Sequence, residues 1–347
     1  MVKFLLYFLI ATLGFSALPS DALNMNEEYP IEELLSVFEE TIEFISPEIK
    51  NHETCDTLSI NFKNPYWNIV TIDGKREVAL NYKEGVHGIL IELPKNFLFN
   101  GDFSFADEVE GTTILDLELK EIGDNQYLFL QHPPQIPTRI YKDTLDPKKI
   151  YIAIAKSYNP YPYKVVLDPG HGGFDPGASY FGVHEKDIVL DIALRMEHKL
   201  KDLGIDVVYT RSTDEFIDLY ERAYISNDIN PNAFISIHNN ASKSTAPRGI
   251  GTYLYTPNGY QKEERTALAT YVQESLTSEF PDWKDWGILW ENFCVTRETN
   301  NPSILIEFGF LSNPKDRDLL QKEEIRERAA KAITRGINSF VKNNDGY

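Results

Sequence analysis

The hydrophobic pattern of this chain changes near residue 157, and this change constrains the fold more than any other feature. Before it, apolar and polar residues alternate in short segments such as 58–62, 88–93 and 126–130. After it, short apolar runs are separated by longer stretches with apolar residues at helical spacing. The first pattern is typical of half-buried strands, and the second of strands that alternate with helices. At 347 residues, the chain is long enough for two domains.

The segment between the two patterns, at 157–163, is rich in proline and tyrosine and predicts a linker. We expect a smaller β-rich accessory domain at 23–156, with strands spaced as in a β-sandwich and a short amphipathic helix at 31–46. We expect an α/β domain at 164–347, with a largely parallel sheet flanked by helices. Its strands are predicted near 165–167, 206–210, 233–237, 251–255 and 303–306, and its helices near 185–203, 219–226, 261–277 and 323–341.

Residues 1–22 resemble a secretory signal peptide. Lys3 supplies the positive start, and the apolar run at 4–16 is too short to span a bilayer comfortably. An uncleaved anchor is the alternative. An exported chain would act in the periplasm, in the cell wall or outside the cell.

The charge of the chain limits its partners. The formal net charge is −19, and no cluster of lysine and arginine offers a phosphate-binding face. We therefore expect no nucleic-acid partner, and no membrane attachment beyond the signal segment.

Polar residues follow three apolar strands of the second domain: His171 in DPGHGG, His238 in ISIHNN and Glu307 in ILIEFGF. We expect each to lie just past the carboxyl end of its strand, where ligands gather in parallel sheets. Glu185, in HEKD, opens a helix. Two imidazoles and a carboxylate form the ligand set of an open catalytic zinc site, and a second carboxylate can then move protons.

Each of these residues also has a structural explanation. A histidine at a strand end is commonly a polar group with a hydrogen-bond partner. Glu185 can be a helix-start acid favoured by the macrodipole, and the neighbouring His184 is a competing ligand. Glu307 follows a buried strand, where it could form a salt bridge with Arg297 or, with a pKa raised by burial, accept and return protons.

Four segments in order, VVLDPGHGGFDPGA, HEKD, FISIHNNAS and RETNNPSILIEFGFLSNP, resemble the zinc-dependent N-acetylmuramoyl-L-alanine amidases of the amidase 3 family. The resemblance covers residues 164 to about 341. It implies that His171, Glu185 and His238 hold one catalytic Zn²⁺ and that Glu307 is the catalytic glutamate. It also implies that the substrate is peptidoglycan, cut between N-acetylmuramic acid and the L-alanine of the stem peptide.

Further expectations follow from this resemblance. Asn240 and Arg297 are candidate donors to the substrate. Some amidases of this family carry an inserted helix that covers the zinc until a protein activator displaces it. The short loop after Asn240 predicts no such helix here, and any activator is unknown. The first domain stands where AMIN-type targeting domains stand in some exported amidases, although a spacer is the alternative.

Two other functions are compatible with the sequence: a zinc peptidase of the stem peptide, and a wall-binding protein with a degenerate site. Three tryptophans, Trp283, Trp286 and Trp290, have spacings of three and four and predict one face of a helix. They could pack in the core, or Trp283 or Trp286 could line the substrate groove.

Overall fold

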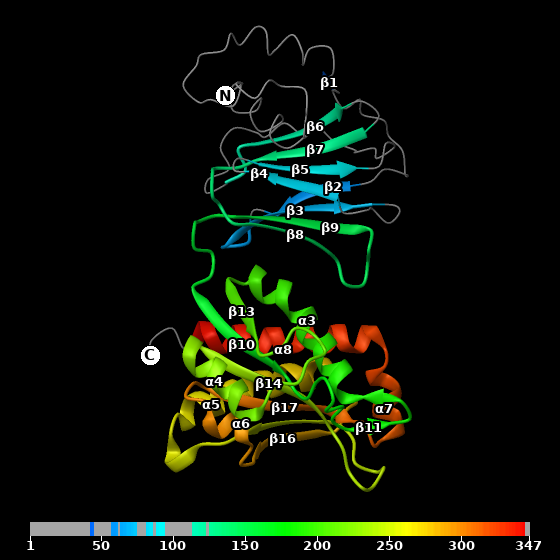
Figure 1. Ribbon diagram of the computed structural model, residues 1–347, viewed down its shortest axis with the longest axis vertical. Coiled ribbons are helices and arrows are strands. Elements are labelled where there is room, and N and C mark those ends of the chain that lie inside the picture. The colour runs from blue at the N-terminus through cyan, green and yellow to red at the C-terminus, as the bar shows by residue number, and fades with distance from the viewer. Residues whose placement is uncertain are drawn as a thin grey trace. The chain divides into compact units, whose positions relative to one another are not determined.

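The computed structural model describes residues 42–44, 57–61, 63–74, 81–85, 88–93, 113–122 and 125–343. The chain divides into two compact units, Met1–Pro160 and Tyr161–Tyr347 (Figure 1). This division falls inside the segment at 157–163 that was predicted as a linker. The predicted signal peptide at 1–22 lies outside the described residues.

The first unit contains two antiparallel sheets. The order in one is β1-β6-β7-β5-β4, and in the other β2-β3-β9-β8. Segment 113–115 bonds to both, because the Thr113 hydroxyl donates to the Ala155 carbonyl in one and the Leu115 amide donates to the Gln131 carbonyl in the other. The strands are β1 (Ile42–Phe44), β2 (Thr57–Asn61), β3 (Trp67–Asp73), β4 (Asn81–Gly85), β5 (Gly88–Leu93), β6 (Asp116–Ile122), β7 (Asn125–Gln131), β8 (Thr138–Lys142) and β9 (Lys149–Ala155).

The prediction of a helix at 31–46 is wrong for the three residues of that segment that the structure describes. Ile42–Phe44 is a strand that pairs with β6. Backbone pairing with a neighbouring strand outweighs the helical spacing of the apolar residues there.

The second unit is built on a six-stranded sheet with the order β13-β10-β14-β17-β15-β16. The pairing of β15 with β17 is antiparallel, and the other neighbours in this sheet are parallel. The sheet is therefore mixed, so the expectation of a largely parallel sheet is confirmed in part, and the expected α/β fold preceded by a β-rich unit is confirmed. Its strands are β10 (Tyr163–Pro169), β13 (Ile205–Tyr209), β14 (Ala233–Asn240), β15 (Ile250–Leu254), β16 (Asp285–Trp290) and β17 (Ser303–Phe310).

Helices cover both faces of this sheet (Figure 1). On one face, α3 (Glu185–Asp202), α5 (Lys262–Glu279) and α8 (Glu323–Asn343) enclose the larger core. On the other, α4 (Leu219–Ile229) and α6 (Cys294–Glu298) cover a smaller cluster that includes Val166, Phe234 and Leu305. Because side chains alternate along a strand, His238 and Glu307 point to the face of Phe234 and Leu305.

Local sequence explains where these helices begin and end. In α3, acids occupy the first turn and lysines the last, as the macrodipole favours. The Asp218 side chain caps α4 by accepting from the Tyr220 amide, and Asn230 ends that helix in the left-handed conformation. No helix among the described residues is both long and apolar enough to cross a membrane.

Some elements were not predicted. They are the hairpin β11 (Ser179–Tyr180) and β12 (Val183–His184), and the short helices α6 and α7 (Pro314–Leu320). The predicted helix face of tryptophans is wrong, because Trp286 and Trp290 lie on β16, the edge strand of the sheet. Trp283 precedes this strand and is buried against Phe308, with ring centroids 5.0 Å apart.

Candidate metal centre and active site

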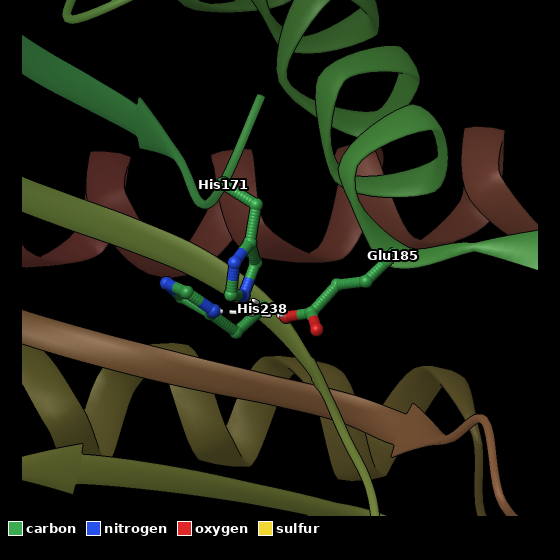
Figure 2. Close-up of side chains that lie close together, drawn as sticks. All are labelled: His171, Glu185 and His238. Atoms are coloured by element: carbon green, nitrogen blue, oxygen red, sulfur yellow. Dashed lines mark hydrogen bonds and ion pairs between the residues drawn. The ribbon is translucent and has the colours of Figure 1, made fainter. Parts of the chain in front are cut away.

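Three of the predicted residues converge on one point. The potential ligand atoms of His171, Glu185 and His238 all lie within 4.8 Å of one another (Figure 2). Glu185 Oε1 lies 3.2 Å from His171 Nε2 and 2.8 Å from His238 Nδ1. The imidazole rings meet edge to face, with centroids 4.9 Å apart. These residues come from a loop, a helix start and a strand that are distant in sequence.

Glycines make room for these side chains. A Cβ on Gly170 would stand 2.2 Å from His238 Cε1, so no larger residue fits beside this ring. A Cβ on Gly177 would stand 2.6 Å from both Glu185 Oε2 and His171 Cδ2. His171 itself has a φ of 61°, a left-handed conformation that is uncommon outside glycine and often marks functional sites.

Hydrogen bonds fix the orientation of the cluster. His171 Nδ1 lies 2.8 Å from Asp175 Oδ2. When Nδ1 carries the proton of this hydrogen bond, the lone pair of Nε2 is available to bind a metal ion. Glu185 accepts from the backbone amides of Ala178 and Asn239. Metal-ligating histidines commonly donate their other ring N–H to a carboxylate, as the pairing of His171 with Asp175 allows.

Glu185 and His171 each stabilise the charged form of the other. Burial alone would raise the pKa of Glu185, but its hydrogen bonds to His171 and His238 dominate and hold that pKa far below its usual range. Burial likewise opposes the charged form of His171, yet the adjacent Glu185 raises the pKa of this histidine. The cluster therefore combines a carboxylate that stays ionised with two imidazoles, which suits a divalent cation.

Glu307 lies beside this cluster. It is in register with His238 on the neighbouring parallel strand, so the two side chains leave the same face of the sheet. Its Oε2 is buried and has no hydrogen-bond partner among the described residues. Burial, and secondarily the charge of Glu185, raise the pKa of Glu307 well above its ordinary value. A buried carboxylate oxygen without a partner costs free energy, so such a group is a candidate for a functional role.

The expectation that His238 and Glu307 lie just past strand ends is wrong, because both lie inside their strands, β14 and β17. Only His171 follows its strand. The apolar runs predicted the start of each strand, but backbone pairing continues through the polar residues that follow them.

A set of buried charged residues that the sequence patterns do not identify holds the loop of His171 in place. Buried Arg222 donates to the His171 and Pro169 carbonyls and to Asp168, while buried Arg211 donates to the Pro169 and Gly170 carbonyls. Asp168 also accepts from Ser236. This network anchors the loop that carries His171. The only signal in the sequence is an aspartate that ends an apolar strand and two arginines in later segments.

The remaining candidates have other partners. Arg297 donates to Glu298 and Asn292, and no ion pair links it to Glu307 in the described structure. His184 Nδ1 lies 2.9 Å from Ser179 Oγ and is outside the cluster. Asn240 ends β14. Burial and the charge of Glu307 raise the pKa of Tyr253, and Asn240 lowers it, so both residues lie close to the Tyr253 hydroxyl. The structure thus places Asn240 near Glu307.

Comparisons with known proteins agree with this site. A family model, Amidase_3, described as N-acetylmuramoyl-L-alanine amidase, matches residues 165–339. An uncharacterized protein of Bacillus subtilis, YqiI, is 38% identical over 176 residues, which cover 51% of this chain and 84% of the relative. The N-acetylmuramoyl-L-alanine amidase LytC of the same organism is 28% identical over 265 residues, which cover 71% of this chain but only 50% of LytC.

Among solved structures, an N-acetylmuramoyl-L-alanine amidase from Clostridium difficile 630 is similar, with a TM-score of 0.50 and 35% identity. The similarity covers 53% of this chain and 98% of that protein. The matched region corresponds in extent to the second unit, which holds the whole cluster. The chain therefore belongs to the amidase 3 family.

Proposed function

We propose that this chain is a peptidoglycan hydrolase, an N-acetylmuramoyl-L-alanine amidase, that depends on one zinc ion held by His171, Glu185 and His238. The observation that carries this proposal is the convergence of these three side chains beside Glu307. Two imidazoles and a carboxylate suit Zn²⁺ and leave a coordination position open. The glycines that clear space around these side chains, and the bond between Asp175 and His171, support the same ligand set.

The reaction is hydrolysis of the amide between the lactyl group of N-acetylmuramic acid and L-alanine. A zinc ion bound here supplies Lewis-acid chemistry, polarising the amide carbonyl and lowering the pKa of a water from about 15.7 to about 7. Glu307 accepts the proton of the attacking water as general base, then returns it to the alanine nitrogen as that amine leaves. Asp175 and the backbone amides that bond to Glu185 keep the ligands oriented.

Export is part of this proposal, because the substrate lies outside the cytoplasm and residues 1–22 resemble a signal peptide. The chain would then act in the periplasm or the cell wall. For the first unit we propose a role in targeting to the wall. The match to LytC extends into the first unit, because 71% of the chain is more than the second unit contains.

The chain needs no activator to uncover the site under this proposal. The segment between β14 and β15, residues 241–249, contains no helix that could act as a plug. In family members with such a plug, the helix follows the strand that carries the second histidine.

The decisive experiment compares Glu307→Gln with His171→Ala. We expect Glu307→Gln to keep one zinc per chain but to lose about 10²–10⁴-fold in turnover, because only the proton-transfer group is removed. We expect His171→Ala to lose both zinc and activity. Metal analysis and dye release from labelled peptidoglycan measure the two quantities, and Glu263→Gln, an exposed acid of α5, is the control.

The reaction products distinguish the proposed amidase from a zinc peptidase and from a degenerate binding protein. Mass spectrometry should find an intact stem peptide freed from muramic acid. Cleavage within the stem peptide would indicate a zinc peptidase. Retention on peptidoglycan without any cleavage would indicate a degenerate binding protein. Near-normal turnover by Glu307→Gln would refute its role in proton transfer.

A further inference from the structure

The edge strand β16 carries a feature that the proposed reaction does not use. Trp286 is inserted as an extra residue in the pairing of β16 with β15. Ile250 is in register with Asp285, but the next residue, Gly251, is in register with Gly287. Gly287 has a φ of 69°, which permits the bulge. Bulges next to active sites re-aim a side chain, and here the re-aimed side chain is that of Trp286.

Several contacts hold this bulge in place. Trp286 Nε1 donates to the Arg248 carbonyl at 2.8 Å, and the Ile250 amide donates to the Lys284 carbonyl. Asp285 Oδ1 accepts from the Gly287 amide and from Gln273 of α5. The hydrogen bond of its indole and those of the residues before and after it thus hold Trp286 in place, although 38% of its surface is exposed.

The position of Trp286 is defined relative to Glu307. Gly251 is in register with Glu307 across the antiparallel pair β15–β17. A Cβ on Gly251 would lie 3.2 Å from Trp286 Cβ, so the Trp286 side chain leaves its backbone beside the point where β15 has no side chain. With strands about 4.8 Å apart, β16 lies about 10 Å from β17, which an extended peptide spans with about three residues.

The direction from Glu307 to Trp286 leads away from the metal cluster. In the order β10-β14-β17-β15-β16, His171 follows β10, His238 lies on β14 and Glu307 on β17. If Glu307 protonates the leaving alanine nitrogen, the departing peptide lies on the side of Glu307 that faces away from the cluster. The strands on that side are β15 and β16.

Lys284 places a positive charge next to Trp286. Its ammonium group lies 3.8 Å from the centroid of the Trp286 ring, a cation–π contact that restrains the long side chain. Lys284 is exposed and has no ion-pair partner among the described residues, whereas many other cations of this unit are paired with acids. A restrained, unpaired ammonium in a protein with net charge −19 is suited to bind a carboxylate.

We propose that Lys284, held on Trp286, forms a subsite for a free carboxylate of the stem peptide, at the second residue after the scissile amide. This inference rests on the proposed amidase function and adds a determinant of substrate choice to it. Lys284 would contact the substrate directly. Trp286 and the bulge would position Lys284.

The test compares two soluble muramyl-peptides that differ at one group. One carries D-isoglutamate as its second residue, with a free carboxylate, and the other carries D-isoglutamine, with an amide. We expect the wild-type chain to have a higher kcat/KM for the carboxylate substrate. Lys284→Met should lower kcat/KM for that substrate about five-fold, the loss of one partly exposed ion pair, and leave the amide substrate unchanged.

Trp286→Ala should give the same selective loss, because it removes the support of the ammonium group. Lys262→Met, a change of an exposed lysine at the start of α5, should alter neither substrate. Zinc content and the unfolding temperature show whether each variant is intact. If Trp286→Ala is unfolded, Lys284→Met still decides the question.

Three outcomes would overturn the subsite: no preference in the wild-type chain, an equal loss with both substrates in Lys284→Met, or no loss in that variant. An equal loss for both substrates in Trp286→Ala would overturn the positioning role assigned to the indole. Failure of the amidase function itself looks different, because the wild-type chain would then release no stem peptide from either substrate.

Discussion

Asp168 shows how one fully buried residue can serve this site without touching a substrate. Burial opposes its charged form, but Arg222 and the hydroxyls of Ser236 and Thr210 outweigh burial and lower the pKa of Asp168. Because Arg222 also holds the His171 carbonyl, the ionised carboxylate supports the loop of the metal cluster. The buried ion pair is thus a structural prerequisite of the site.

We expect Asp168→Asn to lower the free energy of unfolding by about 3 kcal/mol at neutral pH, because Arg222 is left buried without its counter-charge. The pKa of Asp168 is lower in the folded state than in the unfolded state. Its stabilising contribution is therefore complete above about pH 4 and is lost as the pH falls toward the lowered value. Urea unfolding of both proteins across this range measures the difference.

The difference between the wild-type chain and Asp168→Asn should shrink on acidification. Asp206→Asn is the matched control, because Asp206 forms only a partly exposed pair with Lys164 and should contribute little. A difference that stays constant down to pH 2 would contradict the ionised state of Asp168.

The close approach of the loop after β10 to the strand β14 sets the geometry of the metal cluster. The start of the loop after β10 continues beside β14, because the Gly170 amide donates to the Ile237 carbonyl. The ring of His238 then occupies the space where Gly170 has no side chain. This close approach requires glycine for its size, since the backbone of Gly170 is not in the left-handed region.

We expect Gly170→Ala to lower zinc affinity by about tenfold or more, because the added methyl group displaces the His238 ring from its bonding position. Metal titration with a competing chelator measures this affinity. Gly182→Ala is the control, since its Cβ meets no atom within 4 Å and only backbone strain results. Unchanged zinc affinity in Gly170→Ala would contradict the assigned role of His238.

For the whole molecule, we expect residues 161–347 to fold and to cleave soluble muramyl-peptides without the first unit or an added activator. This unit contains the metal cluster, Glu307 and its own large core. Circular dichroism on heating and the rate of peptide release measure folding and activity. An unfolded fragment, or one that is active only with a second protein, would refute the prediction.

The same fragment tests the role of the first unit. If that unit targets the enzyme, removing it should reduce retention on purified sacculi while leaving the rate on soluble substrates unchanged. Equal retention with and without residues 1–160 would indicate a spacer.

The sequence alone predicted the class of the fold and the members of the cluster. Buried parallel strands are continuous apolar runs, and the helices of an α/β unit are long and periodic, so β10, β14, β17, α3, α5 and α8 were all expected. Edge strands have weaker hydrophobic patterns in the sequence than buried strands do. The tryptophans of β16 have spacings that fit a helix, and only the pairing with β15 makes them part of a sheet.

The four polar residues of the site were identified by their motifs, but how they act together was decided by tertiary structure. The register of β14 with β17 sets Glu307 beside His238, and no local pattern encodes a register between strands 69 residues apart. The pairing of the buried residues Asp168, Arg211 and Arg222 could not be predicted for the same reason, because long-range hydrogen bonds depend on the assembled fold. Sequence determined which groups were available, and tertiary packing decided which of them meet.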